Sequence, residues 1–591
     1  MVRLGGLVFA LAFWAPAGSA QGMGGAAKVT PRESGLAKIA RPAPAFRVND
    51  IAAAAGLAAV DVHGGTAAKK HIIEMTGHGV AIFDFNNDGL RDIFLANGTR
   101  AGMASPAPHA LYENLGGGRF RDVTVASGIV NHGWGQGVCA GDYDNDGNVD
   151  LAITYFGHNR LYRNLKGGRF VDVTATLGLA TGGQRWATSC AFLDYDRDGL
   201  LDLFISNYVV FDPATAANPG SSPFCFWRGL AVFCGPKGFP SGMNLLYRNE
   251  GRRFVDVSQP SGIERKGLHY GLGVVTADWD NDGWTDIYVA CDSTPSILYR
   301  NNRNGTFTDI SIEAGTAFGD AGQEQGSMGV AAGDYNNDGF LDIVRTNFMD
   351  ETSTLYKNLG QWFFEDATQP AGLALQTKVV GWGTEFFDLD HDGWKDIFMA
   401  NGHIYPELEG KAAGEEYRQS KILYWNLRNG AFRDIAGASS VLGNRFSSRG
   451  VATGDLDGDG ALEILVSNMN EKPSLLQFQL ERGNSILIEL AGTKSNRSAI
   501  GGRVTLKAGA LSLTDEVRSG SSFASQSDFR LHFGLGNAAA VGQIDIRWPN
   551  GGKETVYALP VNRWITIREG EGVVSQRSFG GEVIPGPSSK R

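Results

Sequence analysis

A short acidic pattern that recurs seven times constrains the fold of this chain more than any other feature. One copy is GDYNNDGFLDI, residues 333–343, in which Asp334, Asn336, Asp338 and Asp342 are spaced two, two and four residues apart. Side-chain oxygens at this spacing suit a hard cation, and a glycine at the sixth position permits the sharp turn between them. Seven copies of one spacing predict a repeat protein.

The seven copies are numbered here as loops 1 to 7, and positions 1, 3, 5 and 9 of each loop are its predicted metal ligands. These positions are Asp84, Asn86, Asp88 and Asp92 in loop 1; Asp142, Asp144, Asp146 and Asp150 in loop 2; Asp194, Asp196, Asp198 and Asp202 in loop 3; Asp278, Asp280, Asp282 and Asp286 in loop 4; Asp334, Asn336, Asp338 and Asp342 in loop 5; Asp388, Asp390, Asp392 and Asp396 in loop 6; and Asp455, Asp457, Asp459 and Glu463 in loop 7. Position 6 is glycine in every copy, and position 10 is always apolar.

The sequence around the loops predicts β-strands and excludes a helix–loop–helix calcium site. Such a site needs a bidentate glutamate at position 12, where these loops carry Leu95, Ile153, Ile205, Val289, Arg345, Met399 and Val466. Strand-like runs such as DIFLAN follow each loop, and six copies continue with LYxN and then FxD. The 81 glycines in 591 residues, about twice the average usage, are typical of an all-β protein with many tight turns.

The two ends of the repeat region predict how it closes. The seventh unit has no LYxN or FxD segment after its loop, whereas residues 45–57 resemble the missing piece and have no loop before them. The start of the chain is therefore expected to complete the last unit. We predict an all-β fold with a seven-bladed β-propeller over residues 45–480, closed by this N-terminal strand, because closure protects the terminal edges. An insertion at 208–243 interrupts it.

These motifs carry a resemblance to known families. The pattern GVAAGDYNNDGFLDI, LYKN and FxD resembles FG-GAP/VCBS repeats, which implies a seven-bladed propeller like the head of integrin α-subunits. Alternating segments such as SILIEL and WITIRE predict a second, small β-domain at 485–570. Its KSNRSAIGGRV, EVRSGSSFASQ and LHFGLG segments resemble the ASPIC/UnbV domain. The whole chain thus resembles the cartilage acidic protein family and its bacterial homologues, a resemblance that implies an architecture and leaves the activity open.

The beginning of the chain predicts export. Arg3, the apolar run GLVFALAFW and small residues before Ala20 are typical of a signal peptide at 1–20, which a linker at 21–44 would follow. No other apolar run approaches the length of a membrane span, and residues 571–591 are expected to form a flexible tail. The protein is therefore expected to be secreted, in the periplasm or outside the cell.

The five cysteines fit an oxidising compartment. Cys225 and Cys234 lie close together in the insertion and are expected to form a disulfide. Cys139, Cys190 and Cys291 cannot all pair with one another, so at least one is expected to be a buried thiol. Their pairing stays open.

The chemistry of the loops favours calcium, with up to seven ions. Calcium takes 6–8 oxygen ligands, and all the predicted ligands except Asn86 and Asn336 are acidic. Empty loops would crowd carboxylates that repel one another. Zinc would require His or Cys, and the only such residue in the loops is His391 at an outward-facing position. Loop 7, which has Glu463 at position 9, is the loop most expected to differ from the others in metal binding. The alternative for some loops is a metal-free turn held by backbone hydrogen bonds.

No catalytic motif such as GxSxG, HExxH or a P-loop is present. His71, Glu74 and His78 are interpreted as turn and surface residues. We expect a non-catalytic module that binds or adheres to an extracellular or envelope protein or glycan. The alternative is an exported enzyme, active on polysaccharide or phosphoester, that uses the propeller as a scaffold; acidic or histidine side chains converging in a cleft away from the loops would distinguish it. A third possibility is an envelope assembly scaffold. The net charge of −10 argues against nucleic acid as a partner.

Overall fold

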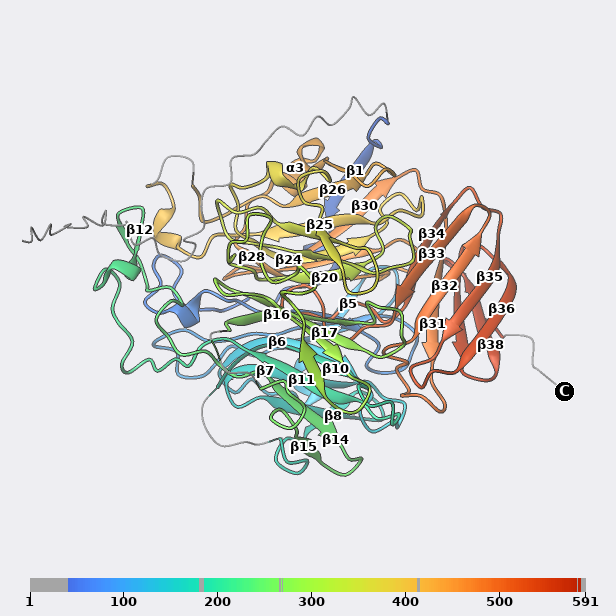
Figure 1. Cartoon of the computed structure of the whole chain (residues 1–591), viewed down its shortest axis with the longest axis horizontal. Helices are drawn as coiled ribbons and strands as arrows, with labels where there is room; N and C mark the ends of the chain where they lie inside the picture. Colours follow the sequence, from blue (N-terminus) through green and yellow to red (C-terminus); the bar gives the residue numbers. More distant parts are fainter. Residues whose placement is uncertain are drawn as a thin grey trace, which may run out of the picture.

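The computed structural model describes residues 41–585, except for 180–184, 265–266, 268, 412–414 and 582. The expected signal peptide and nearly all of the expected linker lie outside the described residues. The described part is all-β (Figure 1). Its short helices are α1 (Ala52–Ala55), α2 (Thr124–Ser127) and α3 (Ser440–Gly443), with 3-10 turns at Ile72–Glu74, Pro223–Cys225, Leu373–Leu375, Pro406–Leu408 and Ala436–Ala438. None of the described helices is long and apolar enough to cross a membrane.

Four of the repeat units form separate four-stranded antiparallel sheets, in which the acidic loop connects the first strand to the second. They are β2 (Val80–Phe83), β3 (Asp92–Leu95), β4 (Ala110–Asn114) and β5 (Phe120–Asp122); β16 (Gly271–Ala277), β17 (Asp286–Cys291), β18 (Ile297–Asn301) and β19 (Phe307–Asp309); β20 (Val330–Gly333), β21 (Asp342–Arg345), β22 (Thr354–Asn358) and β23 (Phe364–Asp366); and β24 (Gly381–Phe387), β25 (Asp396–Asn401), β26 (Ile422–Asn426) and β27 (Phe432–Asp434). Position 9 of each loop is the first residue of the second strand.

The second and third units are joined into one eight-stranded sheet. Their strands are β6 (Trp134–Gly141), β7 (Asp150–Gly157), β8 (Arg160–Leu165) and β9 (Arg169–Asp172), followed by β10 (Arg185–Leu193), β11 (Asp202–Asn207), β14 (Leu245–Asn249) and β15 (Phe254–Asp256). The bridge is short, because β10 pairs with β7 only at Arg185↔Gly157 and Trp186↔Phe156. A propeller implies a separate sheet for each unit. The two sheets are joined here because β7 and β10 extend further than their counterparts and meet at their ends.

The seventh unit takes its fourth strand from the start of the chain. Its sheet consists of β28 (Ser448–Gly454), β29 (Glu463–Asn468), β30 (Ser474–Leu480) and β1 (Phe46–Asp50). β1 pairs antiparallel with β30 from Phe46↔Leu480 to Asp50↔Leu476, which is the pairing that the sequence predicted. The first strands of successive units contact one another in the order β2, β6, β10, β16, β20, β24 and β28, and β28 contacts β2. The arrangement is propeller-like.

The units pack against each other through apolar faces. The position 10 residues of all the loops are at most 2% exposed. One core cluster joins Phe83 and Phe94 of the first unit to Val138 and Leu151 of the second. Because neighbouring sheets cover both faces, the central strands are nearly continuous apolar runs.

The insertion at 208–243 contains a small hairpin, β12 (Phe226–Trp227) and β13 (Leu230–Ala231). Cys225 and Cys234 form the predicted disulfide beside it. Figure 1 shows this hairpin on the side of the repeat region opposite the C-terminal domain. Trp227 and Phe233 pack against Tyr405.

The C-terminal domain consists of two packed sheets. One has the order β34 (Leu531–Gly536), β31 (Asn484–Ala491), β37 (Arg563–Arg568), β38 (Gly572–Ser578) and β39 (Val583–Pro585); the other has the order β33 (Leu511–Glu516), β32 (Arg503–Ala508), β35 (Ala540–Arg547) and β36 (Lys553–Pro560). The domain was expected to end at 570 and a flexible tail to begin at 571, which is wrong for β38 and β39, at 572–578 and 583–585. β38 pairs along β37 from Arg568↔Gly572 to Arg563↔Ser578, because the edge of β37 offers it a row of hydrogen-bonding partners.

Candidate metal centres and the plugged interior

Backbone hydrogen bonds shape each acidic loop around its first and ninth residues. In loop 1, Asp84 accepts hydrogen bonds from the backbone N–H groups of Asp88 at 3.2 Å and Gly89 at 2.8 Å. Asp92 accepts from the N–H groups of Phe85 at 3.0 Å and Asn114 at 2.7 Å. These bonds hold positions 1 and 9 facing the same turn, as a metal site requires.

The turn requires left-handed backbone at two positions. The glycine at position 6 has φ between 86° and 91° in all the loops, as its identity predicted. Position 4 is also left-handed, and it is asparagine in four loops, Arg197 in loop 3, His391 in loop 6 and Gly458 in loop 7. Asparagine tolerates this conformation better than most residues do.

In five loops the structure brings three predicted ligands together. One oxygen from each member lies within 4.8 Å of the others in the groups Asp142, Asp144 and Asp146; Asp194, Asp196 and Asp202; Asp278, Asp280 and Asp282; Asp388, Asp390 and Asp396; and Asp455, Asp457 and Glu463. Loop 7 is therefore among the clustered loops despite its glutamate. Loops 1 and 5, where position 3 is Asn86 or Asn336, do not gather three carboxylates in this way.

Several of the clustered oxygens are buried without a hydrogen-bond partner. They are Oδ1 of Asp144, Asp194, Asp196 and Asp390. A buried polar atom without a partner is costly, so a metal-free turn held by backbone hydrogen bonds does not account for these atoms. A cation within the cluster would satisfy them. The residues of loops 2, 3 and 6 therefore fit a bound metal ion.

Burial and the charges of neighbouring aspartates favour the protonated form of several buried loop carboxyls. Burial raises the pKa of Asp92 to about 8. Burial, together with the charges of neighbouring aspartates, raises the pKa of Asp142 and of Asp194 to about 7. The pKa of Asp202, at position 9 of loop 3, is raised well above its usual range for the same reasons. A positive ion would offset this cost.

Arginines partly neutralise the outer carboxylates. Arg163, the third residue of its LYRN segment, lies 2.7 Å from Asp144 and 3.0 Å from Asp146. Arg248, in the equivalent place, lies 2.8 Å from Asp196. These partners reach the loops from the solvent side, and the sequence analysis did not assign them a role.

The asparagine that ends each LYxN segment connects two loops, a role that the sequence analysis missed. Its backbone N–H donates to the position 9 carboxylate of its own unit, and its side-chain Nδ2 donates to the position 2 carbonyl of the preceding loop. The Nδ2–carbonyl pairs are Asn114–Leu456, Asn164–Phe85, Asn249–Tyr143, Asn301–Tyr195, Asn358–Trp279 and Asn426–Tyr335, at 2.8–2.9 Å. The presence of asparagine in all six copies was the available signal.

A segment of the C-terminal domain runs between the first strands of the repeat units. This plug segment comprises residues 518–528. Gln526 exchanges backbone hydrogen bonds with β2, since Ile82 N–H donates to its carbonyl and its N–H donates to Val80 at 2.9 Å each. Ser522 and Val330 of β20 exchange a pair at 2.8 and 2.9 Å. The N–H of Val138 in β6 donates to Ala524 at 3.0 Å.

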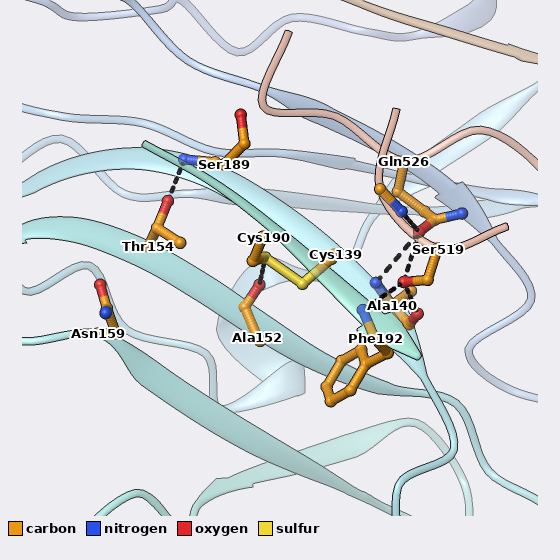
Figure 2. Close-up of a disulfide and its surroundings, with 12 residues drawn as sticks. Cys139, Ala140, Ala152, Thr154, Asn159, Ser189, Cys190, Phe192, Ser519 and Gln526 are labelled. Carbon is orange, nitrogen blue, oxygen red and sulfur yellow. Dashed lines mark hydrogen bonds between the residues drawn. A yellow bond between two sulfur atoms is a disulfide. The ribbon is translucent and has the colours of Figure 1, made fainter. Parts of the chain in front are cut away.

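Serine side chains extend these contacts to further units. Ser519 donates to Ala140 at 2.7 Å and accepts from the N–H of Phe192 in β10 at 3.2 Å (Figure 2). Ser522 Oγ accepts from Thr384 of β24 at 3.1 Å, and Ser527 Oγ accepts from Thr453 of β28 at 3.1 Å. Ser519 and Ser522 are 0% exposed. The space between the first strands of the repeat units is thus filled by the chain itself.

Two of the remaining cysteines lie near this segment. Cys139 and Cys190 form a disulfide that joins β6 to β10, and Figure 2 shows it close to Ser519 and Gln526. Cys291 is a buried thiol, in line with the expectation of at least one. The open pairing is therefore resolved as Cys139 with Cys190.

The segment before loop 1 that contains His71, Glu74 and His78 agrees only in part with the prediction of turn and surface residues. Glu74 caps a turn by accepting from the backbone N–H of Lys70 at 2.8 Å and of His71 at 3.0 Å. His78 was expected at the surface but is 0% exposed. It lies 2.6 Å from Asp61 and 2.7 Å from the ring of His63, which secures it in the interior.

Comparison with known proteins defines the class. The family model "FG-GAP-like repeat" matches residues 84–153, 142–205, 278–345 and 413–466, and the model "ASPIC and UnbV" matches residues 492–574. The chain therefore contains FG-GAP-like repeats followed by an ASPIC and UnbV domain, as the motifs predicted.

Among individual proteins, the chain is similar to cartilage acidic protein 1. It is 26% identical to the Mus musculus protein over 309 residues, which cover 50% of this chain and 44% of the relative. It is 27% identical to the Xenopus tropicalis protein over 292 residues, which cover 48% and 42%. The chain spans less than half the length of the curated relatives it matches.

Among solved structures, the chain is similar to a lectin from Agrocybe aegerita that recognises non-reducing terminal N-acetylglucosamine, at 18% identity and a TM-score of 0.34, with 61% of this chain and 79% of the lectin covered. The V. cholerae biofilm matrix protein Bap1 matches at 14% identity and a TM-score of 0.26, with 63% and 59% covered.

Proposed function

We propose that this protein is an exported, calcium-stabilised binding module built on a closed seven-bladed propeller. The pairing of β1 with β30 and the contact between β28 and β2 support closure. The observation that carries the proposal is the set of buried acidic clusters with unpartnered oxygens, Asp144, Asp194, Asp196 and Asp390 among them. Calcium, with its preference for several oxygen ligands, suits such clusters best.

Each loop would hold an ion through the side chains at positions 1, 3, 5 and 9. The ion would supply positive charge where carboxylates crowd together. The protein's own contribution is orientation, because hydrogen bonds such as those of Asp84 and Asp92 fix both ends of the loop before an ion arrives. The loops connect the first and second strands of the sheets, so order in the loops stabilises the sheets.

A binding role is favoured over catalysis because the groups of acidic and histidine side chains described away from the loops, around His78 and around Glu385, are enclosed. His63 and His78 are buried, and the Asp61 carboxylate beside them is 8% exposed. Glu385 and His532 line a cavity of about 80 Å³ between the plug segment and the repeat units. That volume holds a few water molecules (each occupying about 30 Å³), and it is too small for a polysaccharide. The plug segment also fills the interior that could otherwise form a central site.

A surface cleft beside loop 3 is the place we propose for a partner. It has a volume of about 530 Å³ and is lined by Trp284, Arg248, Arg303 and Asn304 among other residues. An aromatic ring with nearby hydrogen-bonding groups suits a glycan or a peptide. The other candidate function, hydrolysis at this cleft, has no specific observation in its favour.

The test of this function uses the calcium-loaded protein in a glycan array and in a pull-down from extracellular material. The expected result is capture of a defined partner that is lost in Trp284→Ala and Arg303→Ala variants. Phe224→Ala, at an exposed position on the insertion, serves as a control. Turnover of a polysaccharide or phosphoester that the same substitutions abolish would replace this proposal with the enzymatic one.

A further inference from the structure

Six asparagines connect loops 1 to 6 each to the loop before it, and we propose that they couple ion binding at neighbouring loops. This inference rests on the proposed calcium sites and adds a regulatory property to them: occupancy of one loop raises the affinity of the next. Loops 3 and 4 provide the clearest case, because Arg197 at position 4 of loop 3 reaches loop 4 by stacking its guanidinium 4.2 Å from the centre of the Trp284 ring, so the hydrogen-bonded link between these loops runs through Asn301. The asparagines at position 4 of loops 1, 2, 4 and 5 instead form a second hydrogen bond to the following loop.

Asn301 contacts both loops of this pair. Its Nδ2 donates to the carbonyl of Tyr195 in loop 3 at 2.9 Å and to the carbonyl of Thr285 in loop 4 at 3.1 Å. Its backbone N–H donates to Asp286, the position 9 carboxylate of loop 4, at 2.8 Å. The residue is only 3% exposed, so water does not offer alternative partners.

The hydrogen bonds continue into loop 3. The N–H of Tyr195 donates to Asp202, the position 9 carboxylate of loop 3, at 3.3 Å. One chain of hydrogen bonds therefore runs from Asp202 through Tyr195 and Asn301 to Asp286. An ion that fixes the first carboxylate also fixes the backbone of Tyr195 and the amide of Asn301. The second loop is then partly ordered before it binds, so its own binding costs less conformational entropy.

The same link recurs between the other neighbouring loops except loops 6 and 7. In the seventh unit, Phe478 stands in the place of the asparagine, and its ring lies 6.0 Å from that of Phe387. An apolar contact replaces the amide there. Coupling is therefore expected to run from loop 7 through loop 1 to loop 6 and to be interrupted between loops 6 and 7.

Terbium(III) luminescence can test the coupling at a single loop. The ion takes the oxygen ligands of calcium and is excited through a nearby tryptophan, and Trp284 is position 7 of loop 4. The part of the terbium luminescence that disappears when Trp284 is replaced by Phe therefore measures ion binding at loop 4. Loop 3 is disabled by Asp198→Ala, at an exposed position 5 whose carboxylate accepts a hydrogen bond from Leu200 N–H at 2.9 Å. We expect the terbium Kd at loop 4 to rise about fivefold or more.

Two comparisons isolate the link. Asp88→Ala disables loop 1, which is not adjacent to loop 4, and should change the loop 4 Kd by less than about twofold. Asn301→Ala should abolish the effect of Asp198→Ala. Asn302→Ala, whose side-chain amide donates to Thr306 and Thr308 within its own unit, should preserve it. If Asn301→Ala does not fold, the comparison of Asp198→Ala with Asp88→Ala tests the coupling by itself.

Two outcomes would contradict the proposal. Equal effects of Asp198→Ala and Asp88→Ala on the loop 4 Kd would overturn the coupling alone. An absence of Trp284-dependent luminescence in the unsubstituted protein would overturn the calcium sites and the coupling together.

Discussion

At the scale of single residues, the turn in each loop requires a glycine at position 6 because the backbone there has positive φ. A substitution that disturbs no contact can test this requirement. Gly339 has φ of +86°, and a Cβ added there would meet no atom within 4 Å. Gly339→Ala is therefore expected to lower the free energy of unfolding by about 1 kcal/mol through backbone strain alone. Urea unfolding in excess calcium measures it. Gly437→Ala, at an equally open site without positive φ, should be nearly neutral, and equal losses at both would contradict this assignment.

Some single-residue features could be predicted from the sequence and others could not. The ligand spacing, the turn glycine and the buried position 10 could all be read from the repeat because their physical demands are local. The role of Asn301 and its equivalents could not, because the carbonyl that each amide reaches belongs to another unit, as in the pair Asn114–Leu456. The repetition of the asparagine signalled that it matters, but only the packing of adjacent units reveals its partner. The burial of His78 was missed for the same reason.

At the scale of elements, the plug segment joins the C-terminal domain to the repeat units. Gly520 has φ of +77°, and a Cβ there would lie 2.3 Å from the carbonyl of Cys190. Gly520→Ala is expected to destabilise the protein by about 2–3 kcal/mol, because strain and overlap act together. Thermal melting and limited proteolysis of the plug segment measure this. Gly509→Ala, with φ of +59° and no atom within 4 Å, isolates the strain and should cost about 1 kcal/mol.

The plug segment was not foreseen because its sequence, RSGSSFASQSD, has the composition of an exposed loop. Ser519, Ser522 and Ser525 are buried, because the first strands of the repeat units present backbone groups with which small hydroxyls can form hydrogen bonds. By contrast, the pairing of β1 with β30 could be predicted, because the last repeat visibly lacked a strand that the first segment supplied. The strand β38 was missed because its pairing depends on the available edge of β37 and not on its own pattern.

At the scale of the whole molecule, the charged loops predict an unusual dependence of stability on pH. In the ion-free protein the pKa of Asp92 is about 8 and that of Asp142 about 7, both above their ordinary value of 3.8. The folded state therefore holds protons that the unfolded state releases between about pH 4 and pH 8. Stability without calcium should fall as pH rises through this window. Melting in chelator at pH 5.5 and pH 8 should show the lower Tm at pH 8.

Calcium should reverse this trend, because the bound ion replaces the protons. The increase in Tm on adding calcium is therefore expected to be larger at pH 8 than at pH 5.5. An increase that is independent of pH would contradict the account of competing protons and ions.

The central claim is that divalent ions occupy the acidic loops and stabilise the repeat units, and elemental analysis combined with melting of the same sample tests it most directly. Folded protein dialysed against calcium is expected to retain about five or more ions per chain, in line with the five clustered groups. Chelation should then lower Tm strongly, because each site at 100 times its Kd contributes about 2.7 kcal/mol. Protein that retains no alkaline-earth metal and melts identically with and without calcium would contradict the claim.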